Sequence, residues 1–266
     1  MGFFDKFKKK DTDSSTREKN NLIISMPMFN SNENYSLDKI VNDLKSHWNL
    51  DVDEIEGDDS VATFKIEKET VAVAFMNAPI PPKEFESIIG FNYLWKNAKE
   101  ELNTLKSHAI VSVLGSNTDN VERFKILTKV NASVLRTTGN SLGVYQGSQT
   151  LLLPKSLFLD FAEFLLDDML PIQLWVYVGI INDEKSSIYT YGMKEFGKSE
   201  IEIIDSVLNG SELYDFLLPV LNYILESDVT LNDGETIGFS EDEKIKITKS
   251  KAVYLDGDSL KLENSV

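Results

Sequence analysis

Two glutamates that lie close together in the sequence could form a catalytic pair. Glu200 and Glu202 alternate with isoleucines in the segment SEIEII. In a β-strand they share one face, where neighbouring carboxyl groups could divide the roles of general acid and general base. The same alternation is typical of a strand that turns its charged side chains to solvent. We favour a solvated strand face, with the acid–base pair as the alternative.

The two histidines are the other candidates for acid–base or metal chemistry. His47 lies beside Trp48 at the expected end of a helix, and His108 precedes an apolar run. A histidine that acts as a base needs an oriented partner, and the sequence identifies none for either residue. The chain contains no cysteine and none of the usual phosphate-loop, dinucleotide, zinc-protease or nucleophile-elbow motifs. We therefore expect no cofactor and no metal ion.

The charge of the chain favours binding over catalysis. It has 43 acidic and 27 basic residues, which gives a formal net charge of −16. A nucleic acid is not the expected partner, because phosphate binding requires a basic surface. Acidic residues are concentrated at 51–69 and 226–243, in runs that are either solvated or attract a basic protein. In the second run we select Glu241, Asp242 and Glu243 as candidate binding residues.

A second part of the candidate binding surface lies in the stretch YTYGMKEFGKSEIEI, residues 189–203. Gly192 and Gly197 interrupt a strand-like pattern and allow the strand to bend or bulge. Such a bend would place charged and aromatic side chains at an edge. We favour ordinary turn structure for this segment, with a contribution to binding as the alternative. The candidate residues are Tyr191, Lys194, Glu195 and Phe196.

Apolar periodicity predicts the elements that position these residues. The expected strands are 22–29, 61–66, 71–76, 109–115, 142–146, 172–181, 187–193 and 199–204. The expected helices begin at Ser36, Pro82, Thr118, Pro154 and Ser211. The second helix continues to Leu105, and the run 172–181 is apolar enough to be a central strand. Short strands separated by turns rich in Asp and Gly follow Thr230.

The two halves of the chain share one order of elements, namely strand, helix, hairpin, helix and strand. We predict an α+β protein with two ferredoxin-like (β-α-β-β-α-β) units in tandem. The 118–138 helix connects the units, and a meander of short strands ends the chain. The predicted boundaries are a leader at 1–21, an N-terminal unit with the connecting helix at 22–138, and a C-terminal unit at 139–266.

Residues 1–21 are predicted to be a flexible basic leader that begins MGFFDKFKKK. The leader lacks the apolar core and cleavage site of a signal peptide, and no segment of the chain is apolar enough to span a membrane. Contact of this basic segment with an anionic membrane surface is the alternative to a free leader. Because a chain without cysteine fits a reducing compartment, we expect a cytoplasmic location.

Several segments of the chain resemble one bacterial family. They are VAVAFMNAPIP, HAIVSVLG, GVYQGSQTLLLP, YTYGMKEFGKSEIEI, ELYDFLLPVLNYILES and LNDGETIGFSEDEKIKIT. In this order they are similar to the uncharacterised family called domain of unknown function 4261, over residues 22–263. The resemblance implies no established activity, catalytic residue or cofactor. The segment GMKEFGK is also similar, more distantly, to domains of bacterial immunity proteins.

These observations favour a non-catalytic, acidic protein-binding module of an immunity-like or adaptor type, with a basic protein as its partner. The alternative is a hydrolase-type enzyme with an unfamiliar acid–base site. That site would use His108 or the pair Glu200 and Glu202. A pocket around either group would favour the enzyme, and an exposed surface with apolar and charged residues would favour the binding module.

Overall fold

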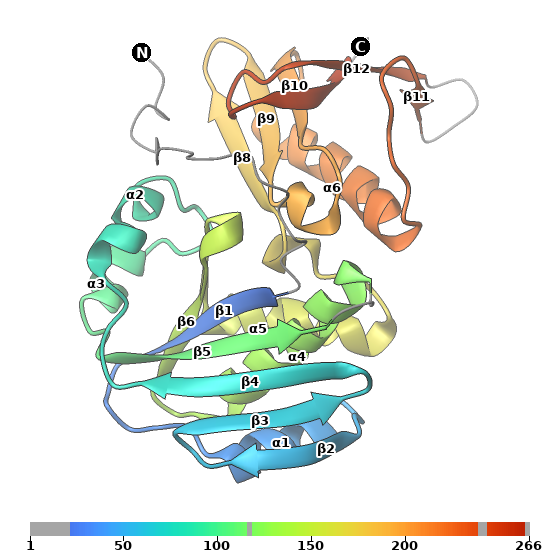
Figure 1. The fold of residues 1–266 in the computed structure, drawn as a ribbon. Helices are drawn as coiled ribbons and strands as arrows, with labels where there is room; N and C mark the ends of the chain where they lie inside the picture. Colours follow the sequence, from blue (N-terminus) through green and yellow to red (C-terminus); the bar gives the residue numbers. More distant parts are fainter. Residues whose placement is uncertain (1–21, 116–118, 239–243, 264–266) are drawn as a thin grey trace, which may run out of the picture.

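The computed structural model describes residues 22–115, 119–238 and 244–263. Within these ranges the chain is an α+β protein with two β-sheets and six α-helices. Figure 1 shows the larger sheet in the lower half of the molecule and the smaller sheet above it. The predicted fold class is therefore confirmed at this level.

The larger sheet has seven strands, and every neighbouring pair is antiparallel. In spatial order the strands are β2 (Val52–Gly57), β3 (Val61–Ile66), β4 (Glu69–Met76), β5 (Ser107–Leu114), β1 (Leu22–Phe29), β6 (Ser141–Gln146) and β7 (Leu151–Pro154). Sequence reasoning found five of these strands and missed β2 and β7. β2 was not predicted because almost all its side chains are exposed, so that its sequence does not alternate between apolar and polar residues. β7 is only four residues long.

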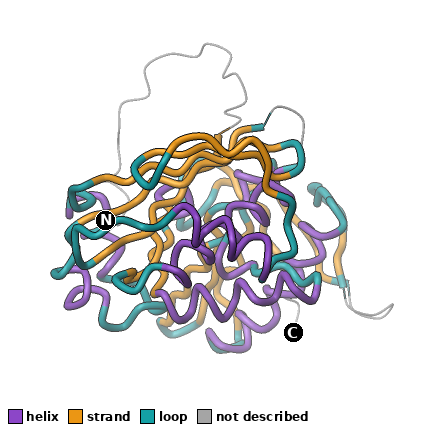
Figure 2. The backbone as a smooth tube through the Cα atoms, turned by 90° about the horizontal axis from the view of Figure 1, so that it is seen from below, coloured by secondary structure: helices purple, strands orange, loops and turns teal. Residues whose placement is uncertain are grey.

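Three helices cover one face of this sheet. They are α1 (Leu37–Ser46), α4 (Asn120–Thr137) and α5 (Lys155–Ala162). Figures 1 and 2 show helices gathered on one side of these strands. The alternation of β1 fits this cover, because Ile23, Ser25 and Phe29 are buried on the helical side. The side chain of Asn131 in α4 donates to the hydroxyl of Ser25 at 2.6 Å.

The first turns of two helices are capped by aspartates. At α1 the carboxylate of Asp59 accepts a hydrogen bond from the Leu37 backbone N–H at 2.7 Å, and Ser36 makes no side-chain cap bond. At α4 the capping side chain is Asp119, next to the predicted cap Thr118, which lies outside the described residues. Both carboxylates stabilise the positive end of a helix dipole.

The prediction of one long helix from Pro82 to Leu105 is wrong. This segment forms the 3-10 turn η2 (Pro82–Glu84) and the short helices α2 (Glu86–Ile89) and α3 (Ala98–Leu102). Asn92 explains the interruption, because its side chain accepts a bond from the N–H of Leu94 and donates to the carbonyl of Leu152. Local side-chain bonds of this kind compete with helical backbone bonds.

The smaller sheet has six strands, with one parallel pair formed by β10 and β13. In spatial order its strands are β11 (Thr236–Ile237), β12 (Ile245–Lys251), β13 (Asp258–Glu263), β10 (Ile201–Ser206), β9 (Ser186–Tyr191) and β8 (Tyr177–Asn182). The helix α6 (Gly210–Glu226) packs against β8 and β9. Its cap is Asn209, in a capping box with Glu212, instead of the predicted Ser211.

The apolar run 172–181 does not form the predicted central strand. It begins with the 3-10 turn η5 (Ile172–Leu174), and β8 is the outermost strand of its sheet. The predicted hairpin is confirmed, since β8 and β9 pair along their whole length. The chain between α2 and α3 lies against this edge, where the hydroxyl of Tyr93 donates to the carbonyl of Val178 at 2.8 Å. This cover explains why an edge strand is so apolar.

The predicted tandem of ferredoxin-like units is not confirmed. In the larger sheet β5 lies between β4 and β1, and all pairs are antiparallel. The first two strands after residue 139, β6 and β7, pair within this same sheet. The change from one sheet to the other therefore comes later in the chain than the predicted boundary at 138–139.

One hydrophobic core extends through both sheets. Where they meet, the ring centroid of Phe124 in α4 lies 4.7 Å from that of Phe196 and 5.9 Å from that of Trp175. Trp175 is fully buried, and its indole N–H donates to the hydroxyl of Thr128 at 2.9 Å. Phe196 therefore packs inside the contact between α4 and the smaller sheet, whereas the sequence placed it among candidate surface residues.

Replacing Phe196 with alanine should destabilise the whole protein, because it opens a cavity in a core that both sheets share. We expect the F196A variant to lose about 3–5 kcal/mol in the free energy of unfolding. Urea unfolding followed by tryptophan fluorescence measures this change. The control is Y223A, since Tyr223 lies on α6 with 49% exposure, and should cost about 0.5 kcal/mol or less. Equal effects of the two substitutions would contradict the assigned role of Phe196.

Candidate functional site

The turn between β9 and β10 holds several of the residues predicted for binding. β9 ends at Tyr191, and the chain then forms the 3-10 turn η6 (Met193–Phe196). Gly192 has a φ of +125° and Gly197 a φ of +70°, backbone conformations that glycine adopts without strain. The two glycines therefore end one strand and reverse the chain toward the next.

Only part of this turn is available to a partner. Lys194 is exposed, Tyr191 and Glu195 are half-buried, and Phe196 is buried. Burial raises the pKa of the Glu195 carboxyl group, and the charge of nearby Glu200 raises it further. The surface left to a partner comprises one amino group, one carboxyl group and one aromatic ring, which is small for a stable protein interface.

The side chain of Glu200 lies inside this turn. Glu200 is 2% exposed, and its carboxylate accepts a hydrogen bond from the Thr190 hydroxyl at 2.7 Å. It also accepts bonds from three successive backbone N–H groups, those of Gly192 at 3.0 Å and of Met193 and Lys194 at 3.3 Å. Successive N–H groups of this kind form an anion-binding nest. The protein fills this nest with its own carboxylate.

Glu202 organises a second loop in the same way. It is fully buried and accepts bonds from the N–H groups of Val253 at 3.0 Å and Tyr254 at 2.8 Å. The hydroxyl of Ser259 and the amino group of Lys261 donate to the same carboxylate at 2.7 Å and 2.5 Å. Burial alone would raise the pKa of Glu202. The hydrogen bonds, with that of Lys261 as the strongest, have the larger effect, so that the pKa is lowered.

The sequence-based interpretation of Glu200 and Glu202 as a solvated face is therefore wrong. Loops of the protein itself cover both side chains, Glu200 just before β10 and Glu202 within it. Both carboxylates are occupied by donors of the fold itself, which leaves neither of them free to take a proton from a substrate. Their structural role is to fix the loops at 192–194 and 253–254.

His47 belongs to a polar network that ties three helices together. Its Nε2 atom lies 3.1 Å from both carboxylate oxygens of Glu163. The guanidinium group of Arg136 in α4 donates to this Glu163 carboxylate at 2.5 Å. It also donates to the carboxylate of Asp43 in α1 at 2.8 Å. Sequence reasoning missed these partners, because they are far apart in the chain and no local motif connects them.

His108 is 8% exposed, and its Nδ1 atom lies 2.8 Å from the carbonyl oxygen of Ala78. Burial lowers the pKa of His108, and the bond to the carbonyl acts in the opposite direction. The Nδ1–H group donates to this oxygen, because a carbonyl oxygen can only accept a hydrogen bond. In the part of the chain that the structure describes, no three His, Asp or Glu side chains are grouped so as to hold a metal ion.

The acidic run 51–69 extends from the edge strand β2 through β3 to Glu69, which is buried at the start of β4. It contains β2, the outermost strand of the larger sheet, on which Asp53, Glu54 and Glu56 are exposed. Charged side chains on an edge strand oppose pairing with further strands. Asp53 pairs with Lys65 and Glu56 with Thr63, so both acids lie on the sheet face opposite the helices.

The acidic run 226–243 mainly forms turns in its described part. Asp233 accepts a hydrogen bond from the N–H of Lys249, and Glu235 from the N–H of Asn232, both at 2.8 Å. These bonds hold the turns beside β11 and β12. The candidate binding residues Glu241, Asp242 and Glu243 lie outside the described residues.

The larger sheet carries a broader candidate surface on the face opposite α1, α4 and α5. Paired residues of antiparallel strands point to the same face. Ile24 pairs with Ser112, and Ser112 pairs on its other side with Ala72. The register also places Lys65 and Thr70 on this face, next to Asp53 of β2. We define the open face as its mainly apolar part, namely Leu22, Ile24, Val61, Thr63, Ala72, Ala74, Met76, Ile110, Ser112 and Leu114.

The open face is apolar and largely uncovered. Its exposed large side chains are Leu22, Ile24, Val61, Met76 and Leu114, with 36–57% exposure. Helices α2 and α3 cover only the end of the sheet near β6 and β7, where Tyr145 and Leu152 pack with Phe85 and Trp95. Figure 1 shows no helix in front of β3, β4 and β5. Sequence reasoning missed this surface because strand pairing, and not sequence, brings its members together.

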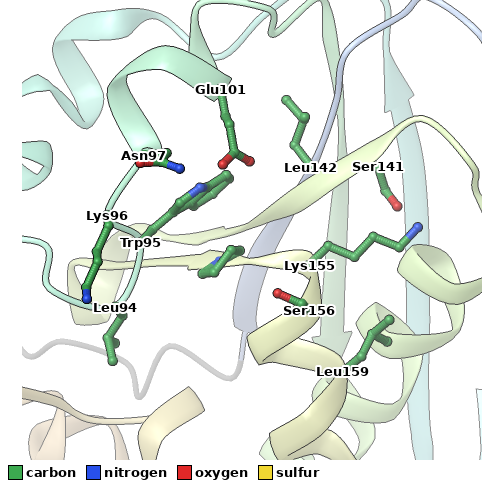
Figure 3. A pocket seen from close by; sticks show the side chains of 11 residues that line it. Leu94, Trp95, Lys96, Asn97, Glu101, Ser141, Leu142, Lys155, Ser156 and Leu159 are labelled. Atoms are coloured by element: carbon green, nitrogen blue, oxygen red, sulfur yellow. The ribbon is translucent and has the colours of Figure 1, made fainter.

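An open groove of about 640 Å³ lies between α3 and the start of α5. Figure 3 shows the apolar side chains of Trp95 and Leu142 in its lining, together with Glu101 and Lys155. The amino group of Lys155 donates to the carbonyl of Thr138 at 3.2 Å, and burial lowers its pKa. Lys155 is thus engaged by the fold, and the lining includes no histidine to act as a base.

Residues 189–263 match the model of a family described as domain of unknown function (DUF4261). The match extends from β9 to the end of β13 and includes α6. The predicted resemblance is confirmed for this part of the chain, and the segments quoted from residues 71–154 lie outside the match. No curated protein and no solved structure matches the chain. Among the described helices, none has the length and apolar character needed to cross a membrane.

Replacing Glu202 with glutamine should destabilise the fold, because the amino group of Lys261 would lose its charged acceptor. We expect a loss of roughly 3 kcal/mol in the free energy of unfolding. The pKa of Glu202 is lowered in the folded protein, so its carboxylate stabilises the fold at pH values above the ordinary pKa of glutamate. This stabilisation is lost as the pH falls from the ordinary pKa through the lowered one. The unmodified chain should therefore lose stability from about pH 5 downward, and E202Q should lose less over that range.

Urea unfolding at several pH values measures both effects. The control is E263Q, because Glu263 lies on the neighbouring strand with a side chain 47% exposed. Its substitution should change the free energy of unfolding by about 0.5 kcal/mol or less. Identical pH profiles for E202Q and the unmodified chain would show that the Glu202 carboxylate does not stabilise the fold.

Proposed function

We propose that this protein is a non-catalytic, acidic protein-binding module, and that a basic protein docks on the open face of its larger sheet. The observation that carries the proposal is the set of exposed apolar side chains on one face of the larger sheet, beside an acidic edge strand. The proposal includes a cytoplasmic location in a bacterium and an immunity-like or adaptor role. The absence of cysteine and the charge of −16 are consistent with both.

The composition of the open face is that of an interface. Soluble proteins rarely leave contiguous apolar patches uncovered, and those that persist usually mark a binding site. An antiparallel sheet with one solvated face normally alternates apolar and polar residues. On β5, however, this face carries the half-buried Ile110 and the exposed Leu114, and on β1 it carries the exposed Leu22 and Ile24. Burial of these side chains would stabilise a complex.

The charge at the border of the open face selects the class of partner. Asp53 and Glu56 of β2 lie on the same side of the sheet as Val61 and Thr63. An apolar centre with a charged rim is the usual anatomy of a protein interface. Acidic rim residues would attract a basic partner and accelerate its association. The net charge of −16 adds a long-range field of the same sign.

The surface predicted from the sequence is a second candidate contact for the same partner. Its described members that reach solvent are Tyr191, Lys194 and Glu195. Glu241, Asp242 and Glu243 remain candidates on their charge alone. We rank this contact below the open face, because only three of its described residues reach solvent, and so few residues make a small interface.

Substitution of Ile24 and Val61 by glutamine tests the proposal. The I24Q/V61Q variant keeps the charge of the chain and should fold normally, because both side chains are exposed. Proteins captured at low salt from an extract of the producing organism are identified by mass spectrometry, and the purified basic partner is then titrated. We expect its Kd to rise at least ~10-fold in this variant, since apolar burial is lost.

The control variant is L166Q/V207Q, which changes two similarly exposed apolar residues outside the open face. It should bind the partner with unchanged affinity. Equal affinities of both variants and the unmodified chain would exclude the open face as the docking surface. Turnover of a captured molecule by the protein would contradict the non-catalytic part of the proposal.

A further inference from the structure

We propose that the open face binds a segment of the same chain, the leader at residues 1–21. This inference goes beyond the proposed function, because it assigns an intramolecular occupant to the face and requires no partner. The leader lies outside the described residues. Three features of the molecule support the assignment, namely where the leader joins the sheet, how far it reaches and which side chains it carries.

The leader joins the sheet at the open face itself. It is followed directly by Leu22, the first residue of β1 and a member of the open face with 39% exposure. The chain therefore enters the sheet beside the exposed pair formed by Leu22 and Leu114. No crossing of the core or of the sheet edge is needed for the preceding residues to lie on this side.

The leader is long enough to reach any part of the open face. From β1 to β2 there are four strand spacings, which amount to about 19 Å. An extended chain between Phe7 and Leu22 spans up to about 50 Å. Phe7 can therefore lie anywhere between β1 and the acidic strand β2, even where the connecting residues follow an indirect path.

The side chains of the leader complement the open face. Phe3, Phe4 and Phe7 have the spacing of residues on one face of a helical turn, and lysines at positions 6, 8, 9 and 10 surround them. The phenylalanines would cover Ile24, Ile110 and their exposed neighbours, and the lysines would approach the acids of β2. The leader has six basic and four acidic residues, whereas the whole chain has a net charge of −16.

Docking of the leader would also regulate the proposed binding site. A segment with apolar and basic residues has the chemistry expected of the basic partner, so that the two would compete for one surface. An occupied face lowers the apparent affinity of a partner in proportion to the fraction of molecules in which the face is free. This consequence rests on the proposed function, but docking of the leader does not.

Disulfide trapping tests the inference in the 266-residue chain, which has no cysteine of its own. In the variant F7C/S112C one thiol is in the leader and the other is at the centre of the open face, where Ser112 lies between Ile24 and Ala72. The matched control F7C/S46C places the second thiol at the exposed end of α1, on the helical side of the sheet. Both variants are oxidised with diamide at low protein concentration and analysed by mass spectrometry.

We expect F7C/S112C to form an intrachain disulfide at least ~10-fold faster than F7C/S46C, because docking raises the effective concentration of the two thiols. Equal rates would overturn the inference. A disulfide between two molecules in F7C/S112C would also overturn it, by making a second copy the occupant. Sedimentation with phosphatidylglycerol vesicles without an intrachain disulfide would assign the leader to membranes instead.

A photo-crosslinking measurement guards against an effect of the S112C substitution on the sheet. Phe7 is replaced by benzoylphenylalanine in an otherwise unmodified chain, and the crosslinked peptides are mapped after irradiation. Crosslinks to residues 22–26, 61–63, 70–76 or 108–114 support docking, and crosslinks confined to other segments overturn it. Because no partner is present in either experiment, their failure would leave the affinity test of the proposed function unaffected.

Discussion

The side chains of the antiparallel larger sheet alternate between two faces, and α4 can cover only one of them. Val111 and Val113 of β5 face the helices and are fully buried, whereas Ile110 and Leu114 on the same strand point the other way. α4 also reaches the smaller sheet through Phe124. The placement of this helix therefore determines the common core and, on the opposite side, the apolar face that remains uncovered.

The charged residues of the protein have distinct structural and functional roles, which their burial separates. Glu200 and Glu202 are buried and bind backbone N–H groups of the protein itself, so their charge serves the fold. Asp53 and Glu56 are exposed on an edge strand, where they oppose strand pairing and border the open face. Carboxylates whose oxygens are bonded to donors of the fold are not available to a substrate, whereas exposed carboxylates at a rim influence association. This separation of roles is the basis on which we propose a binding module.

Sequence periodicity predicted the helices and strands that bury one regular face. It failed where segments distant in the sequence determine which side chains are buried. The stripe of α1 and the alternation of β3 were sufficient to predict both elements. Alternation at 199–204 predicted a solvent-exposed face for Glu200 and Glu202. This prediction is wrong because the loops at residues 192–194 and 253–254 cover the two side chains. The open face has no sequence signature at all, since Ile24 and Ser112 become neighbours only through strand pairing. The helix expected at 82–105 failed because Asn92 bonds to a remote strand.

Thiol labelling of residue 112 in intact cells tests most directly whether the open face is covered in the working protein. The labelling rate of the S112C variant in cells is compared with its rate in the purified chain without residues 1–21. If the open face is covered, labelling of residue 112 is about tenfold slower in cells, with no such difference for S46C on the helical side. Equal rates at residue 112 in the two states would show that neither the leader nor a partner occupies the open face.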